Sequence, residues 1–478
     1  MSAARRTIAE NLGNGVRSTG NLACALCLLA LLGTLTHSVV AQQNQDIPSQ
    51  KATRELDQAF SSLAPPDRPG FAVLVKKGGS VIFKKGYGVR DLRTKARIDE
   101  HTNFRLASFT KQFTAMAIML LVHDHKLRYD QSLRDVFPEF PEYGKTVTVR
   151  NLLNHTGGLP DYEDLMDAME KNKGPIWSAE NQIRDAEVLQ LLEKESQGKF
   201  VPGTKWGYSN SGYVVLGLIV AKVSGKSLPA FLHERIFTPL KMDHTLVFEK
   251  GENRVADRAY GHSKKENNFV ETDHSATSAT QGDGGIYSNL EDLSKWDDAL
   301  RNHALLSERE FLPAITPAKL PPGAESELAQ DVPDSLRGHA NAYGFGWFLN
   351  LQDAHPLLWH YGDTMGFKTA IFRYTDDDLS VIVLCNRSDV DPGALALAAA
   401  QKFLAGNKSA AHCSRIEVPV RYCDRKESAI LTDILKSSHS RRDSGQCLLL
   451  AADFSPRQAR QGPRGFWLFP SRKSGHLA

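Results

Sequence analysis

The chain has 478 residues, of which 41% are hydrophobic and 24% charged, and its formal net charge is +3. This composition is that of a globular protein with one large domain or two modest ones, and it excludes a chain that is mainly disordered. The charge is too small and too dispersed for nucleic acid to be the main partner.

The first 41 residues predict a secretory signal peptide. Basic residues up to Arg17 precede an uncharged apolar run, Leu22 to Leu35, and small residues follow it up to Ala41. The run has 14 residues, fewer than the roughly 20 that a membrane-spanning helix needs. We therefore expect cleavage after Ala41 and an exported protein, periplasmic or secreted, with an uncleaved membrane anchor as the alternative.

Residues 42–68 predict a linker before the folded domain. They are polar and carry Pro65 and Pro66 near their end, although Leu56 to Leu63 could form a short helix. We expect the domain itself to span residues 69–407.

That domain begins with a predicted hairpin. Two β-rich runs, Phe71 to Lys76 and Val81 to Lys85, flank a Gly-Gly turn. Ser108 to Val122 is apolar nearly all round, which is typical of a helix buried inside a domain. Residues 129–280 then form a mostly helical region, with Pro- and Gly-rich loops and predicted helices at Ala186 to Glu195, Gly212 to Val223 and Leu228 to Ile236.

Strand patterns return towards the end of the domain. They cover Ala342 to Leu349, Leu357 to Tyr361, Phe367 to Tyr374 and Leu379 to Leu384, and the Ala-rich run Pro392 to Leu404 predicts a closing helix. The strands therefore come from both ends of the domain, and their short connections favour an antiparallel sheet.

Residues 408–478 form a basic tail to which no fold can be assigned. The tail has 13 Lys and Arg against 6 Asp and Glu, and its hydrophobic periodicity is weak. Such a charge run is usually solvated, so membrane contact is expected only through this tail or an uncleaved signal. The cysteines that remain after signal cleavage have no short spacing typical of a zinc site or a disulfide framework.

Ser108 and Lys111 open the predicted buried helix. Residues three apart share a helix face, so an amine would lie beside a hydroxyl that it can deprotonate. The helix start adds positive potential and N–H groups where an oxyanion would form. A second Ser-x-x-Lys, Ser196 to Lys199, lies in a Gly-containing loop, and we expect no role for it.

Tyr208 and Asn210 are the second candidate pair. In an extended segment they point the same way and offer a phenol for proton transfer and an amide for a substrate carbonyl. Tyr287 to Asn289 repeats the pattern, but its Gly-rich surroundings indicate a turn that enters a helix at Leu290.

His360, Gly362 and Asp363 end a predicted strand and form the third candidate group. His360 and Gly362 share a strand face, and a glycine there lets a substrate approach the backbone. The Asp363 N–H could complete an oxyanion hole with the N–H of Ser108. His155, in another His-x-Gly string, is predicted to be structural.

Together and in this order, the three motifs resemble the serine β-lactamase and penicillin-binding protein superfamily, closest to class C β-lactamases and their esterase and D-aminopeptidase relatives. The likeness covers about Gly70 to Leu404. Flanking strings that support it are Phe104-Arg105-Leu106-Ala107, Leu152-Leu153-Asn154-His155-Thr156-Gly157-Gly158-Leu159 and Gly284-Gly285-Ile286-Tyr287-Ser288.

The resemblance implies an α+β fold, a three-layer α/β/α sandwich in which helices flank an antiparallel sheet beside a mostly helical region. It implies Ser108 as nucleophile and Lys111 and Tyr208 as the proton-transfer pair. The substrate-binding residues would be Asn210, His360, Gly362 and Asp363. No metal or other cofactor is expected, and the partner would be a small-molecule or peptide substrate.

The third motif departs from typical class C β-lactamases, which carry Lys-Thr-Gly on that strand. An ammonium attracts a substrate carboxylate at any working pH, whereas His360 near pH 7 is largely neutral. We therefore expect a peptidase or esterase that forms an acyl-enzyme on an amide or ester, with D-amino-acid or cell-wall peptides as candidates. A β-lactamase, and a catalytically silent wall-associated binding protein, remain the alternatives.

Two unrelated hydrolase types fit less well. Gly207 to Ser211 misses the last glycine of the Gly-x-Ser-x-Gly motif of α/β-hydrolases. His123 and His125 are two residues apart at a predicted helix end, which spreads them over different faces and disfavours a metal site.

Overall fold

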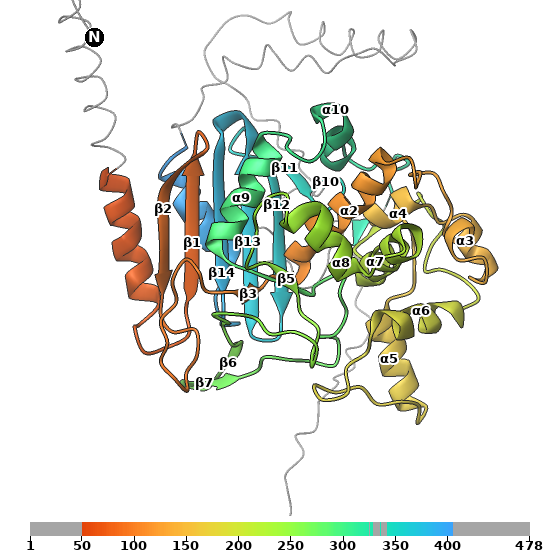
Figure 1. Cartoon of the computed structure of the whole chain (residues 1–478), viewed down its shortest axis with the longest axis horizontal. Helices are drawn as coiled ribbons and strands as arrows, with labels where there is room; N and C mark the ends of the chain where they lie inside the picture. The colour runs from red at the N-terminus through yellow and green to blue at the C-terminus, as the bar shows by residue number, and fades with distance from the viewer. Residues whose placement is uncertain (1–49, 325, 328–334, 336–341, 405–478) are drawn as a thin grey trace, which may run out of the picture. The chain divides into compact units, whose positions relative to one another are not determined.

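The computed structural model describes residues 50–324, 326–327, 335 and 342–404. Its centre is a seven-stranded antiparallel sheet in the order β10-β11-β12-β13-β14-β1-β2 (Figure 1). The strands are β1 (Phe71–Lys77), β2 (Ser80–Tyr87), β10 (Ala342–Tyr343), β11 (Phe348–Gln352), β12 (His355–Thr364), β13 (Phe367–Tyr374) and β14 (Leu379–Cys385). Because β1 pairs with β14, both ends of the domain meet inside one sheet, as predicted.

The sheet separates two hydrophobic cores, because alternate residues of a strand point to opposite faces. In β1, Ala72 and Leu74 belong to one core, and Phe71, Val73 and Val75 to the other. α2 (Lys111–His123) and α9 (Leu290–Arg301) cover the first face, and α11 (Pro392–Gln401) with a helix over residues 50–63 covers the second (Figure 1). These layers confirm the expected α/β/α sandwich.

The helix over residues 50–63 includes the short helix considered for Leu56 to Leu63 and corrects the linker prediction for that part of residues 42–68. Leu56 and Phe60, four residues apart, share one helix face and are each 2% exposed. Phe60 meets Phe71 of β1 edge to face, with ring centroids 5.7 Å apart. The packed domain therefore begins before residue 69, and the polar remainder of the segment hid its short apolar stripe.

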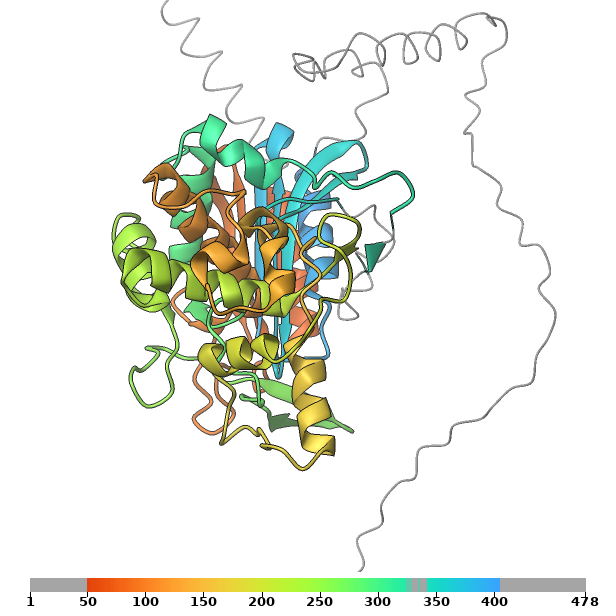
Figure 2. The same cartoon turned by 90° about the vertical axis from the view of Figure 1, so that its right-hand side faces the viewer.

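Residues 129–280 lie beside the sheet, and their regular secondary structure is mainly helical (Figure 2). The helices are α3 (Leu133–Val136), α4 (Val149–Leu153), α5 (Tyr162–Lys171), α6 (Asp185–Glu193), α7 (Asn210–Ser224) and α8 (Leu228–Leu232), which continues as η3 (His233–Phe237). α7 packs against α2, and both are apolar over most of their surface. This contact joins the helical region to the first core.

Short elements complete the domain, and several were not expected from the sequence. β6 (His262–Lys265) and β7 (Asn268–Glu271) form a hairpin, and β3 (Phe104–Arg105), β8 (Ile286–Ser288) and β5 (Leu246–Val247) form a small sheet. β4 (Trp206–Gly207) pairs in parallel with β9 (Ser326–Glu327). The remaining helical pieces are η1 (Ala107–Thr110), η2 (Glu142–Lys145), α10 (Glu308–Phe311), η4 (Leu312–Ile315) and η6 (Thr375–Asp377).

The predicted signal peptide, residues 1–41, and the basic tail, residues 408–478, lie outside the described residues. Within the part that is described, no single helix has the length and hydropathy to cross a membrane. α7 and the α8–η3 segment meet that criterion only as a pair, bent by 75°.

Candidate active site

Ser108 and Lys111 lie side by side where α2 begins. Ser108 is part of η1 and Lys111 is the first residue of the α-helix, and Lys111 Nζ lies 2.9 Å from Ser108 Oγ. Ala107, just before them, has φ of +49°, a conformation that is strained for a residue with a side chain and that clusters at functional sites. The structure thus brings the hydroxyl and the amine together at a helix start, as predicted.

Lys111 is fully buried and donates three hydrogen bonds. Besides Ser108 Oγ, its acceptors are Asn210 Oδ1 at 2.8 Å and the backbone carbonyl of Asp283 at 3.2 Å. A buried ammonium needs such partners, because burial removes its hydration. The segment that contains Asp283 is therefore part of the site, which the sequence did not suggest.

Tyr208 connects β4 to α7 and faces Lys111. Ser209 caps α7, its Oγ accepting from the Gly212 N–H at 3.0 Å, and Asn210 is the first residue of the helix. Lys111 Nζ lies 4.8 Å from the centre of the Tyr208 ring. The predicted pair Tyr208 and Asn210 thus approaches Lys111 from the start of α7.

The third motif lies on β12, where the pairing of the strand changes. The ladder with β11 ends at Trp359, whereas the ladder with β13 continues to Thr364. A Cβ on Gly362 would lie 2.2 Å from the Leu106 carbonyl oxygen and 3.1 Å from Ala107 Cβ. No side chain fits there, so β12 runs directly beside η1 at this point.

His360 is buried and held by two hydrogen bonds. Nδ1 lies 2.6 Å from the Tyr361 carbonyl oxygen, which can only accept, so Nε2 accepts from the Tyr343 hydroxyl at 3.0 Å. Burial and, after it, the charge of Lys111 lower the pKa of His360 to about 3. The imidazole is therefore neutral near pH 7, and its charged fraction is smaller than that of a histidine with the ordinary pKa.

Asp363 pairs with a cation on the neighbouring strand. Its Oδ2 lies 2.8 Å from Lys368 Nζ, and the two residues face each other across β12 and β13. Both side chains are half-buried. Their charges compensate each other, so the third motif adds no net charge to the site.

His155 belongs to the site, although the sequence indicated only a structural role. Its ring is buried 4.4 Å from the ring of Tyr208 and 4.5 Å from that of Tyr343. Burial, and then the charge of Lys111, hold the pKa of His155 well below its ordinary value. One indication of this role was present in the sequence, since His155 lies in the string Leu152 to Leu159 that supports the family resemblance.

The other sequence patterns for which no catalytic role was expected are not among the described residues that contact Ser108 and Lys111. Lys199 forms an exposed ion pair with Asp164, and the Asn289 side chain caps α9 by accepting from the Asp292 N–H at 2.9 Å. His123 pairs with a carboxylate of α10, and His125 is exposed.

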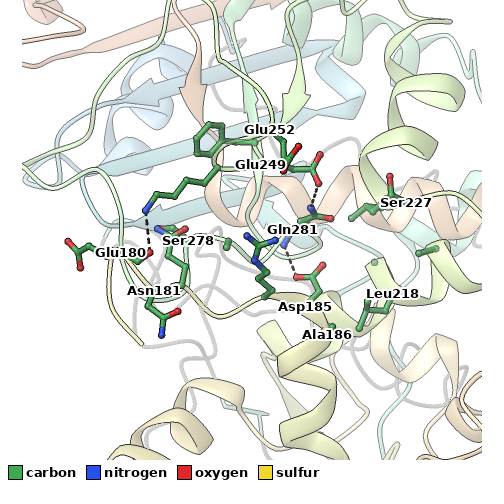
Figure 3. Close-up of a pocket in the computed structure, with 18 residues that line it drawn as sticks. Glu180, Asn181, Asp185, Ala186, Leu218, Ser227, Glu249, Glu252, Ser278 and Gln281 are labelled. Carbon is green, nitrogen blue, oxygen red and sulfur yellow. Dashed lines mark hydrogen bonds between the residues drawn. The ribbon is translucent and has the colours of Figure 1, made fainter. Parts of the chain in front are cut away.

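A cavity of about 400 Å³ lies between α6, α7 and the segment after Ser278, and none of the predicted site residues lines it (Figure 3). On its wall, Asp185 Oδ1 accepts from the Gln281 N–H at 2.9 Å, and the Gln281 side chain donates to Glu249. Burial, with the Asp283 and Glu249 carboxylates nearby, raises the pKa of Asp185 to about 8. The cavity therefore lies apart from the Ser108 site.

Comparison with known proteins agrees with this arrangement. A family model described as Beta-lactamase matches residues 56–405. Penicillin-binding protein 4* of Bacillus subtilis (strain 168) is 31% identical over 403 residues, which cover 80% of this chain and 82% of that protein.

Two solved structures share the fold. The octameric penicillin-binding protein homologue from Pyrococcus abyssi aligns with a TM-score of 0.60 and 26% identity, covering 72% of this chain and 76% of that one. A D-amino acid amidase from Ochrobactrum anthropi SV3 aligns with a TM-score of 0.59 and 22% identity, covering 74% and 98%, and supports the fold alone. The chain therefore belongs to the beta-lactamase family, within the superfamily of serine β-lactamases and penicillin-binding proteins, and is a serine hydrolase of the acyl-enzyme type.

Proposed function

We propose that this protein is an exported peptidase or esterase that forms its acyl-enzyme on Ser108. The observation that carries the proposal is the 2.9 Å contact between Lys111 Nζ and Ser108 Oγ at the start of α2, with the Tyr208 ring 4.8 Å from the same amine. A hydroxyl needs an adjacent proton acceptor to become a nucleophile, and this arrangement supplies two candidates.

Tyr208 is the proposed base and Lys111 its charged partner. Lys111 donates to three acceptors, as many as an ammonium group has N–H bonds, which favours the charged form of the amine. A neighbouring ammonium stabilises a phenolate, so Tyr208 accepts the Ser108 proton as Oγ attacks the substrate carbonyl carbon. The pair then delivers a proton to the leaving nitrogen or oxygen, and later removes one from the water that hydrolyses the acyl-enzyme.

The oxyanion is proposed to bind between the N–H groups of Ser108 and Asp363. The close approach of Gly362 to Leu106 and Ala107 supports this, because it leaves no side chain between β12 and η1. Donors aimed at the developing negative charge are worth about 10²–10³-fold in rate each.

The substrate is proposed to lack a carboxylate next to the third motif. His360 is neutral and Asp363 is compensated by Lys368, so this end of β12 offers no net positive charge. Amides or esters of D-amino acids, or cell-wall peptides, fit this environment, and the name of the penicillin-binding relative points the same way. β-Lactam hydrolysis is then slow at best.

Active-site labelling tests the assignment. We expect a fluorophosphonate probe to modify Ser108, as mapped by peptide mass, and Ser108→Ala to lose labelling and at least about 10³-fold in turnover of p-nitrophenyl esters or D-amino-acid amides. Ser196→Ala is the matched control, because it removes the serine of the other Ser-x-x-Lys. Full turnover by Ser108→Ala would falsify the mechanism, and an unlabelled wild type that turns over no substrate would favour the silent binding protein.

The proposed export has a separate test. Mature protein recovered from outside the cytoplasm is expected to begin at Gln42, and N-terminal sequencing reads this directly. A chain that retains residues 1–41 at the membrane would instead identify an uncleaved anchor.

A further inference from the structure

His155 holds the chain on both sides of Tyr208. Its backbone carbonyl accepts from the Gly207 N–H at 3.0 Å, and its Nδ1 accepts from the Ser209 N–H at 3.2 Å. Its ring also lies 4.4 Å from the Tyr208 ring. One residue therefore contacts the tyrosine through the backbone before it, the backbone after it and its side chain.

The second of these hydrogen bonds depends on a neutral imidazole. A protonated imidazole donates from both nitrogens and has no lone pair for the Ser209 N–H. His155 is 1% exposed, and burial, then the charge of Lys111, hold its pKa well below the ordinary value. Burial therefore favours the neutral form, in which Nδ1 can accept from the Ser209 N–H.

His155 is itself held in place by the end of α4. Its φ is +60°, which turns the chain sharply after the helix, and its N–H and that of Thr156 donate back to the Leu152 and Asn151 carbonyls at 3.4 Å and 2.9 Å. Tyr208, by contrast, lies on a short connection between the two-residue strand β4 and α7. The rigid turn can therefore orient the short connection.

We propose that His155 is a positioning residue that sets the place of the Tyr208 hydroxyl relative to Ser108 and Lys111, through its hydrogen bonds to Gly207 and Ser209 and its ring contact. The inference rests on the proposed function, in which Tyr208 transfers the proton. A displacement of about 1 Å in a catalytic group costs on the order of 10²-fold in rate, so loss of this support should lower kcat and leave KM nearly unchanged.

Two substitutions separate the role of the acceptor from that of bulk. In His155→Asn the amide oxygen takes the place of Nδ1 and can accept from Ser209, whereas in His155→Gln it reaches the place of Nε2 and cannot. We expect His155→Asn to keep at least about a tenth of wild-type kcat and His155→Gln to lose about 10²-fold, with KM within about threefold of wild type in both. Equal kcat values for the two variants would overturn the proposal.

A double-mutant cycle asks whether the effect passes through Tyr208. In a Tyr208→Phe background, His155→Gln should lower kcat by no more than about twofold further, because the hydroxyl that His155 positions is already absent. A full additional loss of about 10²-fold would assign His155 a different role and overturn the proposal.

Two controls complete the experiment. His355→Asn removes a buried histidine at the opposite end of β12, bonded to Asp377, and should lower the Tm without changing kcat. Fluorophosphonate labelling of wild type but not of Ser108→Ala establishes the proposed function independently. If that labelling fails, the proposed function is at fault. If it succeeds and His155→Gln keeps wild-type kcat, the positioning role alone is wrong.

Discussion

His360 and Lys111 show how single side chains set the charge of the site. Lys111 is buried beside three hydrogen-bond acceptors, and burial of His360, together with the charge of Lys111, keeps the neighbouring imidazole neutral. In family relatives with Lys-Thr-Gly, the lysine at this position attracts a substrate carboxylate. Here the position is occupied by His360, an uncharged imidazole that is hydrogen-bonded to Tyr343. Under the proposed function, we therefore expect substrate preference to depend on this side chain of β12.

Replacing that side chain should change the preference. His360→Lys places an ammonium on β12 beside η1, and we expect acylation by nitrocefin or benzylpenicillin to rise at least about tenfold, because the ammonium attracts their carboxylate. Stopped-flow acylation rates measure this. His360→Gln, polar but uncharged, is the control and should show no gain. An equal gain in both variants would show that size, and not charge, limits β-lactam binding.

His360 should also make the protein sensitive to acid. Its pKa is about 3 in the folded chain and about 6.5 in the unfolded one, so the unfolded state binds the proton first. The stability linked to this group is complete above pH 6.5 and is lost as the pH falls from 6.5 towards 3. We expect His360→Gln to flatten the fall of Tm over that range, while His101→Gln, at an exposed histidine, leaves the curve unchanged.

At the residue scale the sequence predicted Ser108, Lys111, Tyr208, Asn210 and His360, and the structure brings them together. The first two were visible because helix spacing alone makes them neighbours. His155, Tyr343 and the Asp283 carbonyl were missed, because their contacts join segments that are far apart along the chain and show no local pattern.

At the scale of elements, the site depends on the contact between β12 and η1. Gly362 permits this contact, since any Cβ would collide with the Leu106 carbonyl and lie 2.5 Å from Thr369 Oγ1. Thr369 in turn donates to the same carbonyl at 2.8 Å. The strand and the turn that carries Ser108 are thus packed as one unit.

Gly362→Ala should therefore force β12 and η1 apart. We expect a loss of about 1–3 kcal/mol in the free energy of unfolding, together with a large fall in turnover, measured by urea denaturation and by ester hydrolysis. Gly284→Ala is the matched control for stability, because a Cβ there would lie 3.7 Å from its nearest neighbour, Ala107. Similar losses of stability in both variants would contradict the role of the close contact.

Element boundaries were predicted well where apolar periodicity is long and poorly where glycine interrupts it. Ala342 to Leu349 was expected to be one strand, yet the structure divides it into β10 and β11, which pair with each other. Gly346 has φ of +77°, and a Cβ on Gly344 would lie 1.9 Å from the Ala314 carbonyl oxygen. These glycines make a tight turn that the alternating apolar pattern concealed.

At the scale of the whole molecule, the helix over residues 50–63 closes the second core of the domain. The order of the strand patterns in the sequence predicted that both ends of the domain contribute strands to the sheet. The polar composition of residues 42–68 did not show that Leu56 and Phe60 would be buried against the second face of that sheet. These two side chains are buried by residues that are distant along the chain, and a single sequence does not reveal such contacts.

Phe60→Ala tests that contribution. Truncating a buried phenylalanine costs about 3–5 kcal/mol, and Phe60 also meets the rings of Phe71, Phe83 and Tyr87. We expect a loss of this size in urea denaturation, with kcat unchanged because the helix packs on β1, three strands away from β12 in the sheet. Leu63→Ala, on the same helix but 51% exposed, should change stability little. Wild-type stability in Phe60→Ala would show that the helix is dispensable.

The pairing of β1 with β14 has a consequence for the timing of folding. Phe71 is matched with Cys385, so a ribosome must complete nearly the whole domain before the first strand finds its inner partner. Until then the hairpin of β1 and β2 lacks the neighbour that makes it stable, because an isolated hairpin is marginal in water. The central sheet can therefore be completed only after most of the domain has been synthesised.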